Sequence, residues 1–368
     1  MARAVQHSLR AVETRRSSGG DSLGGRNFGD LAQNLHPMRA LHAVLPVAIL
    51  LGSIAACGSD GTSPTPTQDA GPSFDAASLP PLPTATGSGR FTMTGRTEDA
   101  IEVVLPPNRP ANPPLLIAFH GTGGEPADTI ADFDLVAKAA SLGFVAIAPR
   151  AGYRNGAQHP ADVDHQANSG ESSWNMWTAN PDANEDLVYV RALIEAARRS
   201  WGADPTRVYT VGFSNGAYFS YFVAASLPQV IAGFAEMSGG WATDSCPTRA
   251  DQDGTSQYLM TTTAPPGQDM ACSTIFADPQ FPSQCRPTAT NKLRPPALGA
   301  RVPFGYVAHY SVDDTVSVVW SCLLAEGLGS RAQTRIRARE LDGTTGHAVM
   351  PNVIDGAFAF FAGRTNAQ

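Results

Sequence analysis

From residue 90 onward, short apolar runs alternate with longer amphipathic stretches. Residues 114–120 form a continuous apolar run, typical of a strand buried on both faces. Residues 182–201 carry apolar side chains at helical spacing on one face and charged side chains elsewhere. The pattern predicts strands at 100–105, 114–120, 144–148, 207–212, 231–237, 303–309 and 335–341, and helices at 129–140, 182–201, 216–227, 316–328 and 353–362. We therefore expect an α/β fold with a mostly parallel central sheet and helices on both faces.

The N-terminal part has a different pattern. Residues 1–37 are rich in Arg, Ser and Gly without periodicity, and we expect them to be an N-terminal extension without function. Residues 38–56 read as a signal peptide whose apolar run, 41–56, ends in Ile54-Ala55-Ala56-Cys57. This ending resembles the lipobox of bacterial lipoproteins, which implies a lipid on Cys57. The alternative is an ordinary signal peptide cut near Ala56, and both interpretations predict export.

Residues 57–89 contain no apolar periodicity and are dense in Pro, Ser, Thr, Gly and Asp, so we expect a lipid anchor and a disordered linker ahead of a catalytic domain at 90–365. The chain has no run of 18 uninterrupted apolar residues, which disfavours a membrane-spanning helix. Export also predicts disulfides, and four cysteines besides Cys57 allow two bonds in three possible pairings: Cys246, Cys272, Cys285 and Cys322.

The distribution of charged residues along the chain limits the classes of binding partner. Of the 26 Lys and Arg in the chain, six lie in residues 1–56, and the acidic remainder disfavours a nucleic-acid or anionic-membrane surface, which would need a basic patch. The sequence contains no metal-ligand cluster, phosphate-binding loop or dinucleotide fingerprint. We therefore expect no cofactor and no bound metal.

The strongest chemical motif is Gly212-Phe213-Ser214-Asn215-Gly216, a G-x-S-x-G between a predicted strand and a predicted helix. Such a turn is too sharp for side chains at its two glycines, and it presents the serine hydroxyl above a helix N-terminus. Ser214 is therefore the predicted nucleophile, the alternative being a glycine-rich structural turn.

A nucleophilic serine needs a histidine base and an acid that orients it, in the chain order Ser, Asp or Glu, His on this fold. His347 lies in a loop between the last predicted strand and helix and is the predicted base. His309 ends a strand and is interpreted as a structural residue. Asp313 is the predicted acid, with Asp314 as the alternate.

The loop after the apolar strand, Phe119-His120-Gly121-Thr122-Gly123-Gly124, resembles the His-Gly oxyanion loop of esterases. We assign the oxyanion donors to the N–H groups of Thr122 and Asn215, with Gly121 as an alternative to Thr122. His120 is expected to shape this loop and not to carry protons.

Four segments together, 204–216, the His-Gly loop, 308–316 and Gly346-His347, resemble the esterase family of polyhydroxybutyrate depolymerases, which includes feruloyl and acetylxylan esterases. The resemblance covers roughly residues 90–365. It implies an α/β-hydrolase fold, secreted carboxylester hydrolysis, and the acid at Asp313, three residues before Val316. The chain departs from the family at Tyr310, where Gly is usual, and lacks the Trp often found near the catalytic His.

Two long loops, about 150–180 and 240–300, are candidates for substrate binding. Trp174 and Trp177 are the predicted substrate-binding aromatics, unless they pack the loop onto the domain. The predicted function is a membrane-anchored serine carboxylesterase acting on polyester or plant cell-wall esters, with hydroxybutyrate, feruloyl or acetyl groups. The alternatives are a peptidase or acyltransferase with the same triad, or a non-catalytic surface-binding lipoprotein.

Overall fold

The computed structural model describes residues 78–93, 99–152, 172–176, 180, 182–240, 264–278, 303–313 and 315–366. The chain divides into two compact units, Met1–Pro66 and Thr67–Gln368, and every described residue belongs to the second. Within the described ranges, no helix combines the length and the apolar character that crossing a bilayer requires. Cys57, Asp314 and Trp177 lie outside the described residues, as do Cys246 and Cys285.

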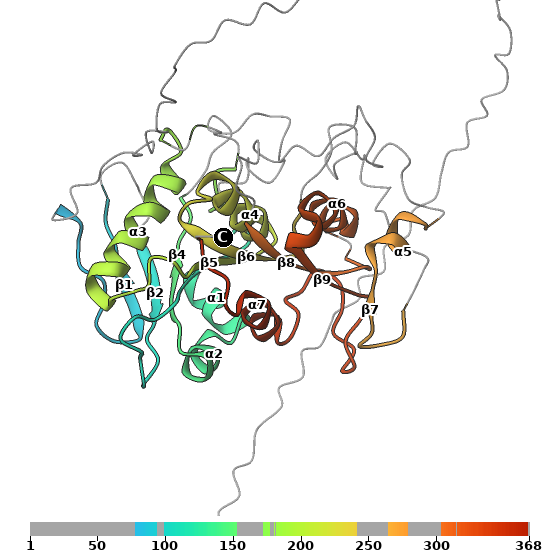
Figure 1. Cartoon of the computed structure of the whole chain (residues 1–368), viewed down its shortest axis with the longest axis horizontal. Coiled ribbons are helices and arrows are strands. Elements are labelled where there is room, and N and C mark those ends of the chain that lie inside the picture. The colour runs from blue at the N-terminus through green and yellow to red at the C-terminus, as the bar shows by residue number, and fades with distance from the viewer. Residues whose placement is uncertain are drawn as a thin grey trace, which may run out of the picture. The chain divides into compact units, whose positions relative to one another are not determined.

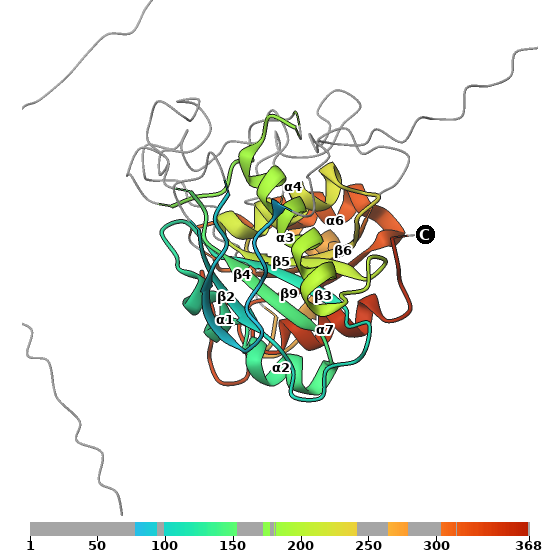
Figure 2. The same cartoon turned by 90° about the vertical axis from the view of Figure 1, so that its left-hand side faces the viewer.

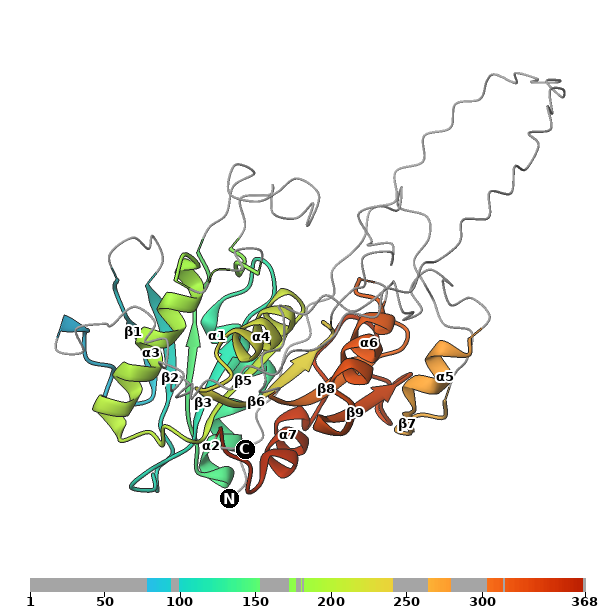
Figure 3. The same cartoon turned by 45° about the horizontal axis from the view of Figure 1, so that its top comes forward.

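The described residues build one mixed sheet with the strand order β1-β2-β4-β3-β5-β6-β8-β9-β7 (Figure 1). The six strands from β4 to β9 in this order run parallel, and β1, β2 and β7 pair antiparallel at the two edges. Figure 3 shows β1 and β7 at opposite ends of the sheet. The strands are β1 (Gly87–Arg90), β2 (Ala100–Val104), β3 (Leu115–Phe119), β4 (Val145–Pro149), β5 (Val208–Phe213), β6 (Ile231–Met237), β7 (Asp269–Met270), β8 (Phe304–Tyr310) and β9 (Ala332–Arg337).

Helices cover both faces of the sheet (Figures 1 and 2). One face carries α3 (Glu185–Trp201), α4 (Asn215–Ser226) and α6 (Val318–Leu328), and the other carries α1 (Pro126–Asp132), α2 (Leu135–Leu142) and α7 (Val353–Phe361). Alternate residues of β3 enter the two resulting cores, so that Leu115 and Ile117 pack on one face and Leu116 on the other. This explains why central strands are apolar at every position. The remaining helices are α5 (Cys272–Phe276) and the 3-10 helix η5 (Gly329–Arg331).

The predicted α/β architecture is confirmed, and several of its elements differ from the prediction. The predicted helix 129–140 is two helices, α1 and α2, because Asp134 adopts a left-handed conformation with φ 50°. The break lets Phe133 and Leu135 both be buried, whereas residues two apart on one helix point to different sides. The predicted strand 335–341 ends at Arg337, where its partner β8 also ends. Leu341 beyond it is 85% exposed.

Packing begins before the predicted domain boundary at residue 90. Leu82 is buried, and the backbone N–H of Leu82 donates to Ser200 Oγ on α3 over 3.2 Å. The Trp201 indole donates to the carbonyl of Pro83 over 2.9 Å. The last residues of the predicted linker therefore belong to the folded domain.

Part of the long 240–300 loop also belongs to the sheet edge. Residues 264–278 supply β7 and α5, and a disulfide joins Cys272 on α5 to Cys322 on α6. This is one of the bonds that export predicts. The apolar cluster beneath it includes Met270, Ile275 and Ile336.

Candidate active site

Ser214 sits in a tight turn between β5 and α4, with φ 55° and ψ −122°. A Cβ at Gly212 would lie 1.9 Å from the carbonyl oxygen of Gly216, and a Cβ at Gly216 would lie 2.3 Å from the carbonyl oxygen of Phe119. Neither position admits a side chain, which confirms the steric argument for both glycines. A non-glycine residue held at this φ is strained, and such strain clusters at functional sites.

The His-Gly loop after β3 lies directly beside the serine. A Cβ at Gly121 would lie 3.2 Å from Ser214 Cβ. The N–H groups of Gly123 and Gly124 donate to the carbonyls of Ser172 and Gly121 over 2.9 and 3.0 Å. Those two donors are therefore engaged within the protein, and the first N–H groups of the loop remain the candidates for an oxyanion.

His120 holds this loop in place, as the sequence predicts. The N–H of Ala151 donates to His120 Nε2 over 3.0 Å, so the proton is on Nδ1, which donates to the Gly121 carbonyl over 2.6 Å. Burial lowers the pKa of His120 to about 4, despite the hydrogen bond to Gly121, which favours the charged form. The ring is therefore neutral at ordinary pH and does not exchange protons with a substrate.

Asp313 follows β8 and His347 lies in the loop between β9 and α7, so both belong to the carboxyl edge of the parallel strands, where Ser214 also lies. His347 Nδ1 is 2.8 Å from Asp313 Oδ2. The Asp313 side chain is fully buried, whereas 19% of the His347 side chain is exposed. The Phe213 ring contacts the His347 ring with 4.6 Å between centroids, which brings the imidazole beside the residue that precedes Ser214.

Both carboxylate oxygens of Asp313 face hydrogen-bond donors. Oδ1 accepts from the N–H groups of Thr315 and Val316 over 2.8 and 2.9 Å, and Oδ2 faces two imidazoles. Burial by itself raises the pKa of Asp313, but the bonds from His309 and His347 outweigh it and hold the pKa well below its usual range. This carboxyl group therefore stays ionised and cannot take a proton from an imidazole.

His309 is interpreted from the sequence as a structural residue at a strand end, and its contact with Asp313 is not apparent from the sequence. It is fully buried in β8, and its Nε2 lies 3.3 Å from Asp313 Oδ2 and 3.0 Å from the carbonyl oxygen of Val316. The spacing of four residues between His309 and Asp313 was the available signal. The sequence places His309 at the end of a strand but does not show which way its ring points.

Trp174 does not present its ring to a substrate, which corrects the predicted substrate-binding role. It is fully buried, and its ring stacks on Phe219 and meets Phe119 edge-on at centroid distances of 4.9 Å. Its indole N–H donates to the His120 carbonyl over 3.0 Å, and its backbone N–H donates to Asn215 Oδ1 over 2.8 Å. A large aromatic with a satisfied indole gains most by burial, which favours packing.

Among the described residues, no group of three or more His, Cys, Asp and Glu side chains is arranged to hold a metal ion. The chemistry available at this edge of the sheet is that of the serine, the two imidazoles, the carboxylate and backbone N–H groups.

Comparisons with known proteins fit this geometry. Residues 102–252 match the Dienelactone hydrolase family. NocK of Nocardia uniformis subsp. tsuyamanensis, named as an esterase, is 29% identical over 218 residues, which are 53% of this chain and 56% of that protein. Poly(3-hydroxyalkanoate) depolymerase C of Paucimonas lemoignei is 28% identical over 142 residues, which are 37% of this chain and 30% of that protein.

Other matching proteins are named acetylxylan esterase and feruloyl esterase. Among solved structures, the acetyl xylan esterase from Aspergillus awamori has a TM-score of 0.44 at 16% identity, over 71% of this chain and 94% of that one. The chain spans about half or less of the length of the two relatives described above. The predicted resemblance is confirmed: this α/β-hydrolase-fold chain matches the Dienelactone hydrolase family over residues 102–252 and is similar in sequence to a polyhydroxyalkanoate depolymerase, feruloyl esterases and acetylxylan esterases.

Proposed function

We propose that the chain is a serine hydrolase of carboxylic esters that works through an acyl-enzyme on Ser214, with His347 as base and Asp313 as orienting acid. The observation that carries this proposal is the 2.8 Å contact between His347 Nδ1 and the buried Asp313 carboxylate, beside a strained serine turn. The same order of Ser, Asp and His along the chain is usual on this fold.

The proton positions support this mechanism. Because Asp313 is ionised, it accepts the Nδ1–H of His347 and leaves Nε2 of that ring to take the proton of Ser214. The serine oxygen attacks the ester carbonyl, His347 returns the proton to the leaving alcohol, and an acyl-enzyme forms. A water molecule then repeats the two steps on the acyl-enzyme and releases the acid.

The developing oxyanion needs donors that are fixed before the reaction. We assign this role to the N–H groups of Thr122 and Asn215. Asn215 is the first residue of α4, so its N–H belongs to the helix end where the dipole favours negative charge. Gly121 stays the alternative on the loop side, because it lies against Ser214.

The proposed substrates are polyester or plant cell-wall esters with hydroxybutyrate, feruloyl or acetyl groups, which the names of the relatives support. The test is a panel of aryl acetates, feruloylated sugars and hydroxybutyrate oligomers, each assayed beside its amide counterpart. We expect hydrolysis of at least one ester class, with the amide far slower. Equal rates on the amide would indicate a peptidase, and faster transfer to an alcohol than to water would indicate an acyltransferase. Absence of turnover, together with no labelling of Ser214 by a fluorophosphonate, would contradict the proposal.

We also propose that the protein is exported and held at the bacterial cell envelope by a lipid on Cys57, with residues 57–77 as part of the tether. Replacing Cys57 with Ser should abolish incorporation of labelled palmitate and release the protein from the membrane fraction. Specific activity should not change, because Cys57 lies far along the chain from the folded domain. If the wild-type protein takes up no palmitate in a bacterial host that processes lipoproteins, the anchor does not exist.

A further inference from the structure

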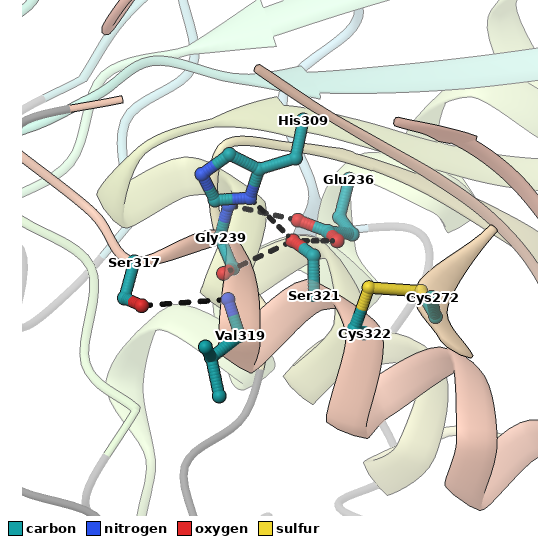
Figure 4. The surroundings of a disulfide bond; sticks show 8 residues. All are labelled: Glu236, Gly239, Cys272, His309, Ser317, Val319, Ser321 and Cys322. Atoms are coloured by element: carbon teal, nitrogen blue, oxygen red, sulfur yellow. Dashed lines mark hydrogen bonds between the residues drawn. A yellow bond between two sulfur atoms is a disulfide. The ribbon is translucent and has the colours of Figure 1, made fainter. Parts of the chain in front are cut away.

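A buried series of polar groups leads from Glu236 in β6 towards Asp313, and Figure 4 shows its members Glu236, Ser321 and His309. Ser321 Oγ on α6 lies 2.7 Å from Glu236 Oε1, and the N–H of Gly239 donates to Oε2 over 2.9 Å. His309 Nδ1 lies 2.7 Å from Ser321 Oγ, and the Nε2 of the same ring faces Asp313. The side chains of Glu236, Ser321 and His309 are all fully buried.

The partners of His309 determine where its protons lie. The Val316 carbonyl, 3.0 Å from Nε2, can only accept, and so can the ionised Asp313, 3.3 Å away. Nε2 therefore carries a hydrogen. The Nε2–H of His309 donates to the Val316 carbonyl, and Asp313 Oδ2 lies 3.3 Å from this nitrogen and 2.8 Å from His347 Nδ1.

Ser321 Oγ connects the Nδ1 of His309 to the carboxyl group of Glu236, so two arrangements of the protons are possible. If Glu236 is ionised, Ser321 donates to it and accepts the Nδ1–H of His309. If Glu236 is protonated, it donates to Ser321, which donates to a neutral Nδ1. The two arrangements hold the same number of protons, and burial raises the pKa of Glu236 to about 7, against the effect of His309, Ser321 and the Gly239 N–H. In both arrangements Nε2–H faces Asp313.

We propose that His309, held by Ser321 and Glu236, is a second histidine partner of Asp313 that keeps this carboxylate ionised and oriented for His347. It is a positioning residue, because it acts on the reaction only through Asp313. The inference rests on the proposed triad and adds to it three residues outside the Ser, His and Asp of the motif: Glu236, Ser321 and His309.

Stability does not account for these residues. Burying an ionisable pair costs about as much as its attraction returns, and apolar side chains of similar volume often serve the fold equally well. The other residues of β6, Ile231–Met237, are all apolar and buried. We attribute the glutamate and the histidine at these positions to a role at Asp313, which His309 contacts directly and to which Glu236 is connected only through Ser321 and His309.

The test compares Ser321→Ala with Ser220→Ala as a matched control. Both serines are fully buried on helices that cover the same face of the sheet. The Ser220 hydroxyl bonds to Thr210 Oγ1 and the Ala235 carbonyl, each over 3.0 Å, and neither partner belongs to the Glu236, Ser321 and His309 series. Each variant removes one buried hydroxyl, so their losses of Tm should be similar.

We expect Ser321→Ala to lower kcat on an activated ester by about 10- to 100-fold, the effect of losing a hydrogen bond that supports a charged group, with KM within about twofold. Ser220→Ala should keep kcat near the wild-type value. His309→Gln, which keeps an N–H near Asp313, should retain more kcat than His309→Leu. Equal kcat in Ser321→Ala and Ser220→Ala, or in the two His309 variants, would overturn the inference.

A spectroscopic measurement on the wild-type protein is independent of how the variants fold. With ¹⁵N-labelled histidine, the Nε2 of His309 should be protonated and slow to exchange with solvent, and its proton resonance should shift in Asp313→Asn. An unprotonated Nε2 would overturn the inference. The kcat values of two variants separate the proposed triad from the proposed role of His309. A severe loss of kcat in Asp313→Asn beside a wild-type kcat in Ser321→Ala would contradict only the role of His309. A wild-type kcat in Asp313→Asn would contradict the triad itself.

Discussion

Replacing Ser214 with Ala is expected to lower kcat on an activated ester by about 10⁶-fold, the loss that follows removal of the nucleophile in a serine hydrolase. In the proposed mechanism this hydroxyl forms the covalent bond to the acyl group, and no other group in the turn can replace it. The fold should not change, because alanine keeps the Cβ of the serine and needs no additional space in the turn. The measurements are kcat and KM on an aryl acetate, and mass spectrometry of the protein after treatment with a fluorophosphonate.

Ser238→Ala is the matched control for this variant. Ser238 follows the neighbouring strand β6, is fully buried and also has a positive φ, 56°. Its loss should leave kcat within an order of magnitude of wild type and leave the fluorophosphonate adduct intact. Turnover near the wild-type value in Ser214→Ala, with contaminating esterases excluded, would show that the nucleophile is another residue.

Asp313→Asn is expected to reduce kcat by ~10⁴-fold, as a carboxamide does in the serine proteases. The amide oxygen can still accept from the N–H groups of Thr315 and Val316, which turns its NH₂ group towards the imidazoles. His347 would then accept at Nδ1 and carry its proton on Nε2. This tautomer cannot take the proton of Ser214, so the geometry survives while the base is lost.

Asp314→Asn, assayed on the same ester, compares the two adjacent acids directly. We expect a loss of only a few-fold, because Asp313 already accepts from His347 and a neighbouring carboxylate acts at most through screened charge. A severe loss in Asp314→Asn beside a mild one in Asp313→Asn would transfer the orienting role to Asp314.

The parts of the fold that the sequence predicts well are those whose physical cause is local. The apolar run 114–120 corresponds to β3, and its every-residue burial follows from helices on both faces. The glycines at 212 and 216 are required by backbone contacts within the turn and with the adjacent strand, so the motif and its strand-turn-helix setting were sufficient. The break at Asp134 was not predictable, since it depends on how Phe133 and Leu135 both reach the sheet.

The parts of the site that could not be predicted arise from contacts between distant segments. The importance of His309 depends on Ser321, 12 residues away, and Ser321 in turn depends on Glu236, 85 residues away. Periodicity carries no information about such contacts. Trp174 was a candidate for substrate binding because it is an aromatic residue in a long loop. Its ring is instead packed against Phe119 and Phe219, and the sequence does not show this contact.

The position of Trp174 has a consequence for protein engineering. Through its indole it holds the His120 carbonyl, and through its backbone it holds the Asn215 side chain, so one residue links the donor loop to the serine turn. A mutant library intended to widen the range of accepted esters should therefore keep Trp174 unchanged. Diversity at this position would disturb the proposed oxyanion donors of every member before any new substrate contact could be selected.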